Sequence, residues 1–151
     1  MRRLKSILLA TVIALSGCQA SKGDGLPGDS EDSRPFAQIS AEETVRFTGT
    51  EPFWGGSVSG KTVIYSTPEK PDGSKIAVTR FAGRGGLSWT GELEGRRFAL
   101  AITPGECSDG MSDRIFPFVA TLEVGGELRT GCGWTERQPF KQDAPLKKSN
   151  G

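Results

Sequence analysis

Residues 107–113, with the sequence CSDGMSD, combine one thiol, two hydroxyls and two carboxylates around a single glycine. Asp109 and Asp113 are four positions apart, so on a helical turn they would share one face. Two carboxylates there could bind a hard cation such as Ca²⁺ or act as an acid–base pair. Ca²⁺ needs more oxygen ligands than this segment supplies. The favoured interpretation is structural: Ser108 or Asp109 caps a short helix and Gly110 permits a turn.

The chain contains no histidine, which excludes His metal ligands and the Ser-His-Asp and Cys-His nucleophile systems. Cys107 then has two alternative interpretations. One is a reactive thiol, which a neighbouring cation or a helix N-terminus would have to activate. No Lys lies near Cys107 in the sequence. The other interpretation is one half of a disulfide, which depends on where the protein is located.

Phe53 and Trp54 are adjacent aromatic residues that follow a Glu51-Pro52 bend. In a β-barrel they could line the mouth and contact a small apolar ligand. Alternatively, Trp54 plugs one end of a filled barrel. The plug is favoured, because a domain of about 90 residues with short strands leaves little room for a cavity.

The N-terminus carries the signals that predict location. MRRLKS is a basic segment, and the apolar run ILLATVIAL that follows is too short to span a bilayer comfortably. The sequence LSGC at residues 15–18 resembles a bacterial lipobox. That resemblance implies a signal peptide at residues 1–17 and a lipid on Cys18. Gln19 follows in place of the Asp that suggests inner-membrane retention, which favours a periplasm-facing position on the outer membrane of a Gram-negative cell.

The charge of the exported chain argues against nucleic acid as a partner. The whole sequence has 19 basic and 18 acidic residues. Removing residues 1–17 subtracts three basic residues, so 19 − 3 = 16 basic residues face 18 acidic ones. A mildly acidic protein has no electrostatic attraction for phosphate backbones.

The remaining chain divides into three parts. Residues 18–43 begin with the lipidated cysteine and are rich in Gly, Ser, Asp, Glu and Pro, which predicts a flexible tether. Residues 135–151 are similarly polar and predict a disordered tail. Residues 44–134 alternate apolar and polar side chains with a period of two, which predicts a single β domain.

Turn-forming residues divide this domain into short strands spaced like those of an antiparallel meander. Eight strands are predicted, at residues 44–49, 53–59, 62–67, 75–83, 87–93, 96–103, 115–124 and 128–134. Eight short strands with one apolar face each favour an all-β fold, a small closed or nearly closed barrel. A β-sandwich is the alternative.

Register follows from matching the apolar faces across each turn. A two-residue turn at Glu94-Gly95 pairs Trp89 with Leu100, both apolar. A turn at Gly85-Gly86 is expected to place Val78 opposite Leu93. At the last hairpin a two-residue turn would put the apolar side chains of residues 128–134 on the wrong face. A three-residue loop at residues 125–127 is therefore predicted, which points Cys132 into the core.

Export favours the disulfide interpretation of Cys107 over the reactive thiol. With Cys18 lipidated, two thiols remain in an oxidising compartment, where an even pair usually forms a disulfide. The chain is expected to leave the sheet at Pro104-Gly105, just before Cys107. The predicted bridge joins Cys107 to Cys132 and ties that loop to the last strand.

Three motifs occur in a fixed order: GTEPFW at residues 49–54, CSDGMSDRIFPF at 107–118 and GC at 131–132. Together they resemble an uncharacterised family of bacterial envelope lipoproteins. The resemblance covers roughly residues 44–134 and implies an exported, membrane-attached β domain. It supplies no established activity, so no catalytic residue is carried over.

The sequence thus favours a non-enzymatic binding or scaffolding module over an enzyme. Its expected partners are the membrane, through the lipid, and an envelope protein, glycan or small ligand that contacts Phe53, Trp54, Asp109 or Asp113. No metal or cofactor is expected. The alternative is a periplasmic hydrolase that uses Asp109 and Asp113 as its carboxylate pair.

Overall fold

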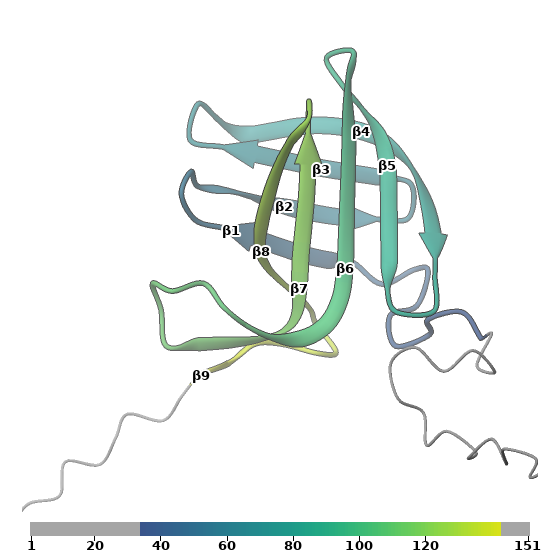
Figure 1. The fold of residues 1–151 in the computed structure, drawn as a ribbon, viewed down its shortest axis with the longest axis vertical. Coiled ribbons are helices and arrows are strands. Elements are labelled where there is room, and N and C mark those ends of the chain that lie inside the picture. Colours follow the sequence, from purple (N-terminus) through teal and green to yellow (C-terminus); the bar gives the residue numbers. More distant parts are fainter. Residues whose placement is uncertain (1–33, 143–151) are drawn as a thin grey trace, which may run out of the picture.

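The structure is a computed structural model, which describes residues 34–142. The predicted signal peptide and Cys18 lie outside the described residues. Eight long strands and one short strand make up the described part (Figure 1). They are β1 (Val45–Gly49), β2 (Trp54–Ser59), β3 (Thr62–Thr67), β4 (Lys70–Ala82), β5 (Leu87–Leu93), β6 (Arg96–Ser108), β7 (Arg114–Val124), β8 (Glu127–Thr135) and β9 (Lys141–Gln142). Across residues 34–142 no helix is long and apolar enough to cross a membrane.

The predicted antiparallel barrel is confirmed. Each strand from β1 to β7 pairs with the next along the chain, and β1 also pairs with β8, which closes the barrel. The short β9 pairs with the start of β7, at Arg114 and Ile115. Closure leaves none of the eight barrel strands with an unpaired edge, so the meander satisfies its backbone hydrogen bonds internally.

Alternation of side chains fills the barrel. β7 illustrates the pattern, because every second residue from Phe118 to Val124 is buried in the core. The main core is formed by the inward side chains of the eight barrel strands together with two residues that precede β1. Its members include Phe36, Ile39, Phe47, Trp54, Val58, Val63, Tyr65, Ile76, Trp89, Phe98, Leu100, Ile102, Phe118 and Leu122.

The β5–β6 register follows the prediction, with Trp89 opposite Leu100 and Gly91 opposite Phe98. Glu94 and Gly95 both have positive φ, at 53° and 73°. That is the backbone of a two-residue turn whose twist matches its flanking strands. Leu87 faces Ile102 and Trp89 faces Leu100, so apolar residues coincide away from the turn, and this local pattern sufficed to predict the pairing.

Three details differ from the prediction. β4 begins at Lys70 rather than at residue 75, so the β3–β4 turn is residues 68–69, and a register irregularity follows Tyr65. Residues 83–86 form a four-residue loop, so Val78 pairs with Gly91 and not with Leu93. The chain also stays in the sheet beyond Pro104, because β6 absorbs an irregularity between Pro104 and Cys107 and continues to Ser108.

The predicted three-residue loop between β7 and β8 is wrong. Val124 pairs with Glu127 and Leu122 with Arg129, so the turn is the two residues Gly125 and Gly126. Both glycines have positive φ, at 59° and 89°, as a tight two-residue turn requires. Because Leu122 faces the core, Arg129 also points inward. Leu128 points outward and is 73% exposed.

The folded domain extends beyond the predicted range 44–134 at both ends. Phe36 and Ile39 belong to the core, and the Phe36 backbone N–H donates to Gly83 O at 2.7 Å. On the C-terminal side the Phe140 ring contacts Phe116 and Trp134. The predicted tether and tail therefore each contribute residues that pack on the barrel.

Candidate functional site

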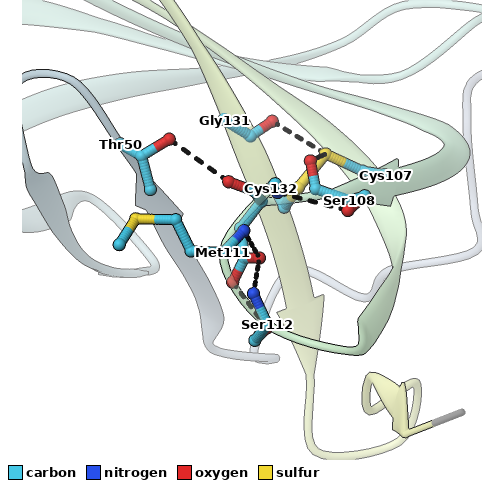
Figure 2. Close-up of a disulfide and its surroundings, with 9 residues drawn as sticks. Thr50, Cys107, Ser108, Met111, Ser112, Gly131 and Cys132 are labelled. Atoms are coloured by element: carbon cyan, nitrogen blue, oxygen red, sulfur yellow. Dashed lines mark hydrogen bonds between the residues drawn. A yellow bond between two sulfur atoms is a disulfide. The ribbon is translucent and has the colours of Figure 1, made fainter.

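The loop around Asp109 is organised by its own carboxylate (Figure 2). Asp109 Oδ1 accepts hydrogen bonds from the backbone N–H groups of Met111 at 3.0 Å and Ser112 at 2.8 Å, and Oδ2 accepts from Ser112 Oγ at 2.8 Å. These bonds, led by those from the backbone, hold the pKa of Asp109 below its usual range. The segment is a turn rather than the short helix considered from the sequence. A carboxylate already bonded in this way shapes its loop and is a poor proton donor.

Asp113 lies exposed in the same loop. Neither aspartate lines the two cavities described below. Among residues 34–142 there is no group of three or more His, Cys, Asp or Glu side chains that could hold a metal ion. The loop is attached to the barrel, because Thr50 Oγ1 donates to Asp109 O at 3.3 Å.

The disulfide between Cys107 and Cys132 is confirmed, with the two Cα atoms 5.5 Å apart. The predicted direction of Cys132 is wrong. Cys132 pairs with Thr48, which lies between the inward residues Phe47 and Gly49, so both Thr48 and Cys132 face the outside of the barrel. Cys132 is nevertheless fully buried. The bridge therefore fastens the outer part of the β6–β7 hairpin over the outer face of β8.

The two aromatic residues that follow the β1–β2 bend are separated by the structure. Trp54 is 3% exposed and its indole lies over Gly49, where a Cβ atom would overlap it. Its ring is 5.9 Å from that of Phe47. Trp54 is thus a core residue, in agreement with the plug interpretation. Phe53 is 51% exposed and lines a cavity.

That cavity, of about 460 Å³, lies at the end of the barrel where residues 50–53, 68–69, 94–95 and 125–126 turn between strands. We call this end the barrel mouth. The cavity is lined by Pro52, Phe53, Tyr65, Thr67, Glu69, Lys70, Ser74, Leu93, Glu94, Arg96, Val124, Gly125, Glu127 and Arg129. A cavity of this size with mixed apolar and polar walls is typical of small-molecule sites.

Arg129 forms the polar centre of the barrel mouth. Its Nη1 donates to the Tyr65 hydroxyl at 3.1 Å, and its Nη2 donates to Glu127 Oε2 at 2.8 Å. The bond to Glu127 raises the pKa of Arg129, so the guanidinium stays charged. Burial raises the pKa of Tyr65 above its ordinary 10.0. The phenol therefore keeps its proton at neutral pH.

The charges at the barrel mouth differ in depth. Three cations and three anions line the cavity, namely Lys70, Arg96, Arg129, Glu69, Glu94 and Glu127. Five of these six residues are exposed, whereas only 22% of the Arg129 side chain is accessible. Water and salt screen the rim charges far more than the charge of Arg129. The field inside the cavity is therefore dominated by a cation.

A second cavity, of about 450 Å³, lies beside the first. Its lining consists of Thr50, Glu51, Pro52, Glu127, Leu128, Arg129 and Thr130. Pro52, Glu127 and Arg129 line both cavities. The Arg129–Glu127 pair therefore stands between the two cavities.

Sequence reasoning found Phe53 but missed Tyr65 and Arg129. The predicted three-residue loop points Arg129 outward, away from the cavity. The Gly-Gly pair at residues 125–126 was the signal that could have found it, because two adjacent glycines are suited to the two-residue turn that points Arg129 inward.

No protein-family model matches this chain, and no curated protein or solved structure matches it either.

Proposed function

We propose that this protein is a lipid-anchored lipoprotein of the bacterial outer membrane whose barrel is a non-enzymatic module that binds a small ligand at the barrel mouth. The observation that carries the proposal is the cavity of about 460 Å³, with Phe53 on its rim and the Tyr65–Arg129 pair in its wall. A cavity of this size, in which polar groups converge beside apolar side chains, is suited to a small ligand.

The hydrolase alternative has less support. Asp109 donates no proton in its present arrangement, because its carboxylate is bonded to Met111 and Ser112 within the loop. The barrel mouth carries Arg, Lys, Glu and Tyr side chains, and its most buried polar contact joins a charged guanidinium to a protonated phenol. That arrangement is suited to holding a ligand. In the same cavity the Glu69 carboxylate is bonded to its own backbone N–H and to the Thr67 side chain, and these bonds hold the pKa of Glu69 below its ordinary 4.5. A carboxylate with a lowered pKa is a weak base for activating a hydroxyl.

The location rests on the N-terminal sequence. The lipobox-like LSGC, ending in Cys18, supports lipid attachment, and the disulfide supports an oxidising compartment. A single acyl chain holds a protein only marginally, whereas the multiple chains of a lipoprotein anchor it stably. The Cys18→Ser variant is expected to leave the membrane fraction or remain unprocessed. If this variant still carried lipid and sedimented with outer membranes, the proposed anchor would be wrong.

The binding function is tested with a pair of tryptophan substitutions on one strand. Leu93 lines the cavity, and Leu93→Trp would fill it. Thr90 is exposed on the outer face of the same β5 strand, so Thr90→Trp is the matched control. Each protein is purified from envelopes, denatured, and the released small molecules are identified by mass spectrometry.

We expect a ligand to be released from the wild type and from Thr90→Trp, and to be absent from Leu93→Trp. Equal melting temperatures of the two variants would show that the loss is not caused by unfolding. Release of the same ligand from a folded Leu93→Trp protein would place binding elsewhere.

A further inference from the structure

We infer that the ligand of the barrel mouth is an organic anion with an apolar body, whose anionic group displaces Glu127 from Arg129 and accepts a hydrogen bond from Tyr65. The inference rests on the proposed function and deepens it, because it names the class of ligand. It also gives Glu127 a role as the internal occupant of the anion position.

The negative charge of the ligand follows from how far Arg129 is withdrawn from water. The Arg129 side chain is 22% accessible, while that of its counter-ion Glu127 is 72% accessible. A charge withdrawn from water keeps a strong field, whereas an exposed charge is largely screened. A ligand that enters the cavity therefore meets an effective positive charge, even though the six charged residues of the lining sum to zero.

The donors needed for an anion are present at this point. A guanidinium has five N–H groups in a planar fork that matches a carboxylate, sulfonate or phosphate. Arg129 uses one of its terminal nitrogens for Tyr65 and the other for Glu127. The Tyr65 oxygen accepts from Arg129 and still carries its own proton, which it can donate to a ligand oxygen.

The apolar part of the ligand follows from the rest of the wall. Leu93 and Val124 line the cavity from β5 and β7, and the exposed ring of Phe53 forms part of its rim. The Tyr65 ring packs edge-on against Phe98, with ring centroids 5.8 Å apart, so Tyr65 contributes both an aromatic ring and a hydroxyl to the cavity wall. Burial of an apolar body against these groups removes apolar surface from water and so adds to the affinity.

Displacement of Glu127 costs little. Its side chain is mostly in water and belongs to the first residue after the Gly125-Gly126 turn. Because Glu127 is the exposed member of the pair, water and salt weaken its attraction to Arg129. When the anion binds, the Glu127 carboxylate is released to water. Arg129 then pairs with the anionic group of the ligand, whose apolar body packs in the cavity.

The test uses two probes that share one ring system. 8-Anilinonaphthalene-1-sulfonate carries a sulfonate, and N-phenyl-1-naphthylamine is the same ring system without it. Both are titrated by fluorescence into the mature chain, made unlipidated by Cys18→Ser. The wild-type barrel is expected to bind the sulfonate probe at least about tenfold more tightly, which corresponds to about 1.4 kcal/mol.

Substitutions then assign the difference to Arg129. Arg129→Met should lower the affinity for the sulfonate probe by about tenfold and leave that for the neutral probe within about twofold. Arg97→Met is the matched control, because Arg97 pairs with Glu123 outside the cavity and its side chain is 67% exposed. Glu127→Gln should raise the affinity for the sulfonate probe about threefold, since the competing anion is removed. This gain does not require Arg129→Met to fold.

The outcomes separate this inference from the proposed function. If both probes bind equally and Glu127→Gln changes neither, the barrel mouth binds ligands but the anion assignment is wrong. If neither probe binds, the proposed function itself fails. Where the sulfonate probe binds, its displacement by decanoate indicates a ligand with an alkyl body, and its displacement by 1-naphthoate indicates an aromatic body. If neither carboxylate displaces the probe, the inference is overturned.

Discussion

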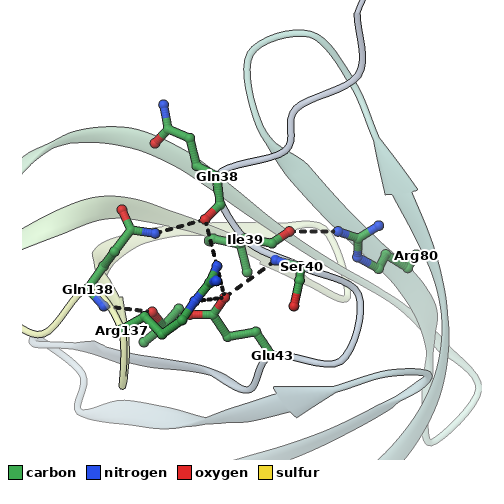
Figure 3. A network of polar contacts seen from close by, with 8 residues as sticks. Gln38, Ile39, Ser40, Glu43, Arg80, Arg137 and Gln138 are labelled. Atoms are coloured by element: carbon green, nitrogen blue, oxygen red, sulfur yellow. Dashed lines mark hydrogen bonds and ion pairs between the residues drawn. The ribbon is translucent and has the colours of Figure 1, made fainter.

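The two ends of the barrel carry ion pairs of opposite arrangement. At the barrel mouth a half-buried cation, Arg129, is paired with an exposed anion, Glu127. At the other end, which we call the capped end, a buried anion, Glu43, is paired with an exposed cation, Arg137, at 2.7 Å (Figure 3). The Glu43 side chain is 8% accessible and that of Arg137 is 64% accessible. Each end therefore withdraws one charge from water, but the two charges have different surroundings.

At the capped end the protein itself surrounds the buried charge. Residues 36–43 lie across this end and insert Phe36 and Ile39 into the core. Arg137 Nη2 and Gln138 Nε2 both donate to Gln38 O, at 3.4 and 3.0 Å, and Arg80 Nη2 donates to Ile39 O at 3.2 Å (Figure 3). At the barrel mouth the buried charge faces a cavity instead. The comparison indicates that the capped end stabilises the fold and the barrel mouth is left open for binding.

Ile39→Ala is expected to have the largest effect on stability. Ile39 is 1% exposed and packs in the core at the capped end. Truncation of a buried isoleucine to alanine costs about 2–5 kcal/mol. Phe53→Ala at the barrel mouth should cost about 0.5 kcal/mol or less, because the ring is half exposed and makes a surface contact. Urea denaturation of both variants measures the difference, and equal losses would mean that the two ends do not differ in this way.

Removal of the disulfide should have the next largest effect on stability. The bridge closes 25 residues of chain, which is worth about 3 kcal/mol in the chain-entropy description. Because the bridge lies on the outer face of β8, the Cys107→Ala/Cys132→Ala double variant should keep its affinity for the sulfonate probe. Denaturation and probe titration are made on the same sample. A loss of binding in a folded double variant would show that the β6–β7 hairpin positions the barrel mouth.

Much of the fold could be predicted because local patterns agree with it. β5 and β6 carry apolar residues on matching faces, so their register follows from alternation alone. β8 could not be predicted in the same way. Its apolar residues Cys132 and Trp134 face outward, where the disulfide with Cys107 and the rings of Phe116 and Phe140 cover them. That cover comes from distant parts of the chain and leaves no trace in the alternation of β8.

The candidate site was less predictable for the same reason. Arg129 could be recognised as an inward residue only after the Gly125-Gly126 turn fixed the register of β8. Its partner Tyr65 is 64 positions away in sequence. The insertion of Ile39 likewise depends on a cluster that assembles only in the folded chain. Neither Ile39 nor Phe36 belongs to a periodic pattern, so composition alone assigned both to a tether.

Glu43→Gln tests the buried charge of the capped end. Burial raises the pKa of Glu43. Hydrogen bonds from Thr135, Arg137 and Ser40 together lower the pKa by more than burial raises it, so it lies below its ordinary 4.5. A lowered pKa in the folded state adds stability above about pH 4.5, and this contribution is lost as the pH falls through the native pKa. Loss of the charged partner should cost about 1–3 kcal/mol at neutral pH.

The measurement is the urea midpoint of wild type and Glu43→Gln across this pH range. The two midpoints should differ at pH 7 and converge in acid, where Glu43 is protonated in both folded and unfolded wild-type chains. A difference that does not change with pH would mean that packing of the side chain, and not its charge, is responsible.

Glu127→Gln makes the same chemical change at the barrel mouth and should have a smaller effect on stability than Glu43→Gln. Its side chain is 72% accessible, so its pairing with Arg129 contributes about 0–1 kcal/mol. The two Glu→Gln variants thus form a matched test. At the capped end the substitution removes the buried member of an ion pair, and at the barrel mouth it removes the exposed member. If Glu127→Gln destabilised the barrel as much as Glu43→Gln, the Arg129–Glu127 pair would be a fixed structural contact, and a ligand anion could not replace Glu127 at low cost.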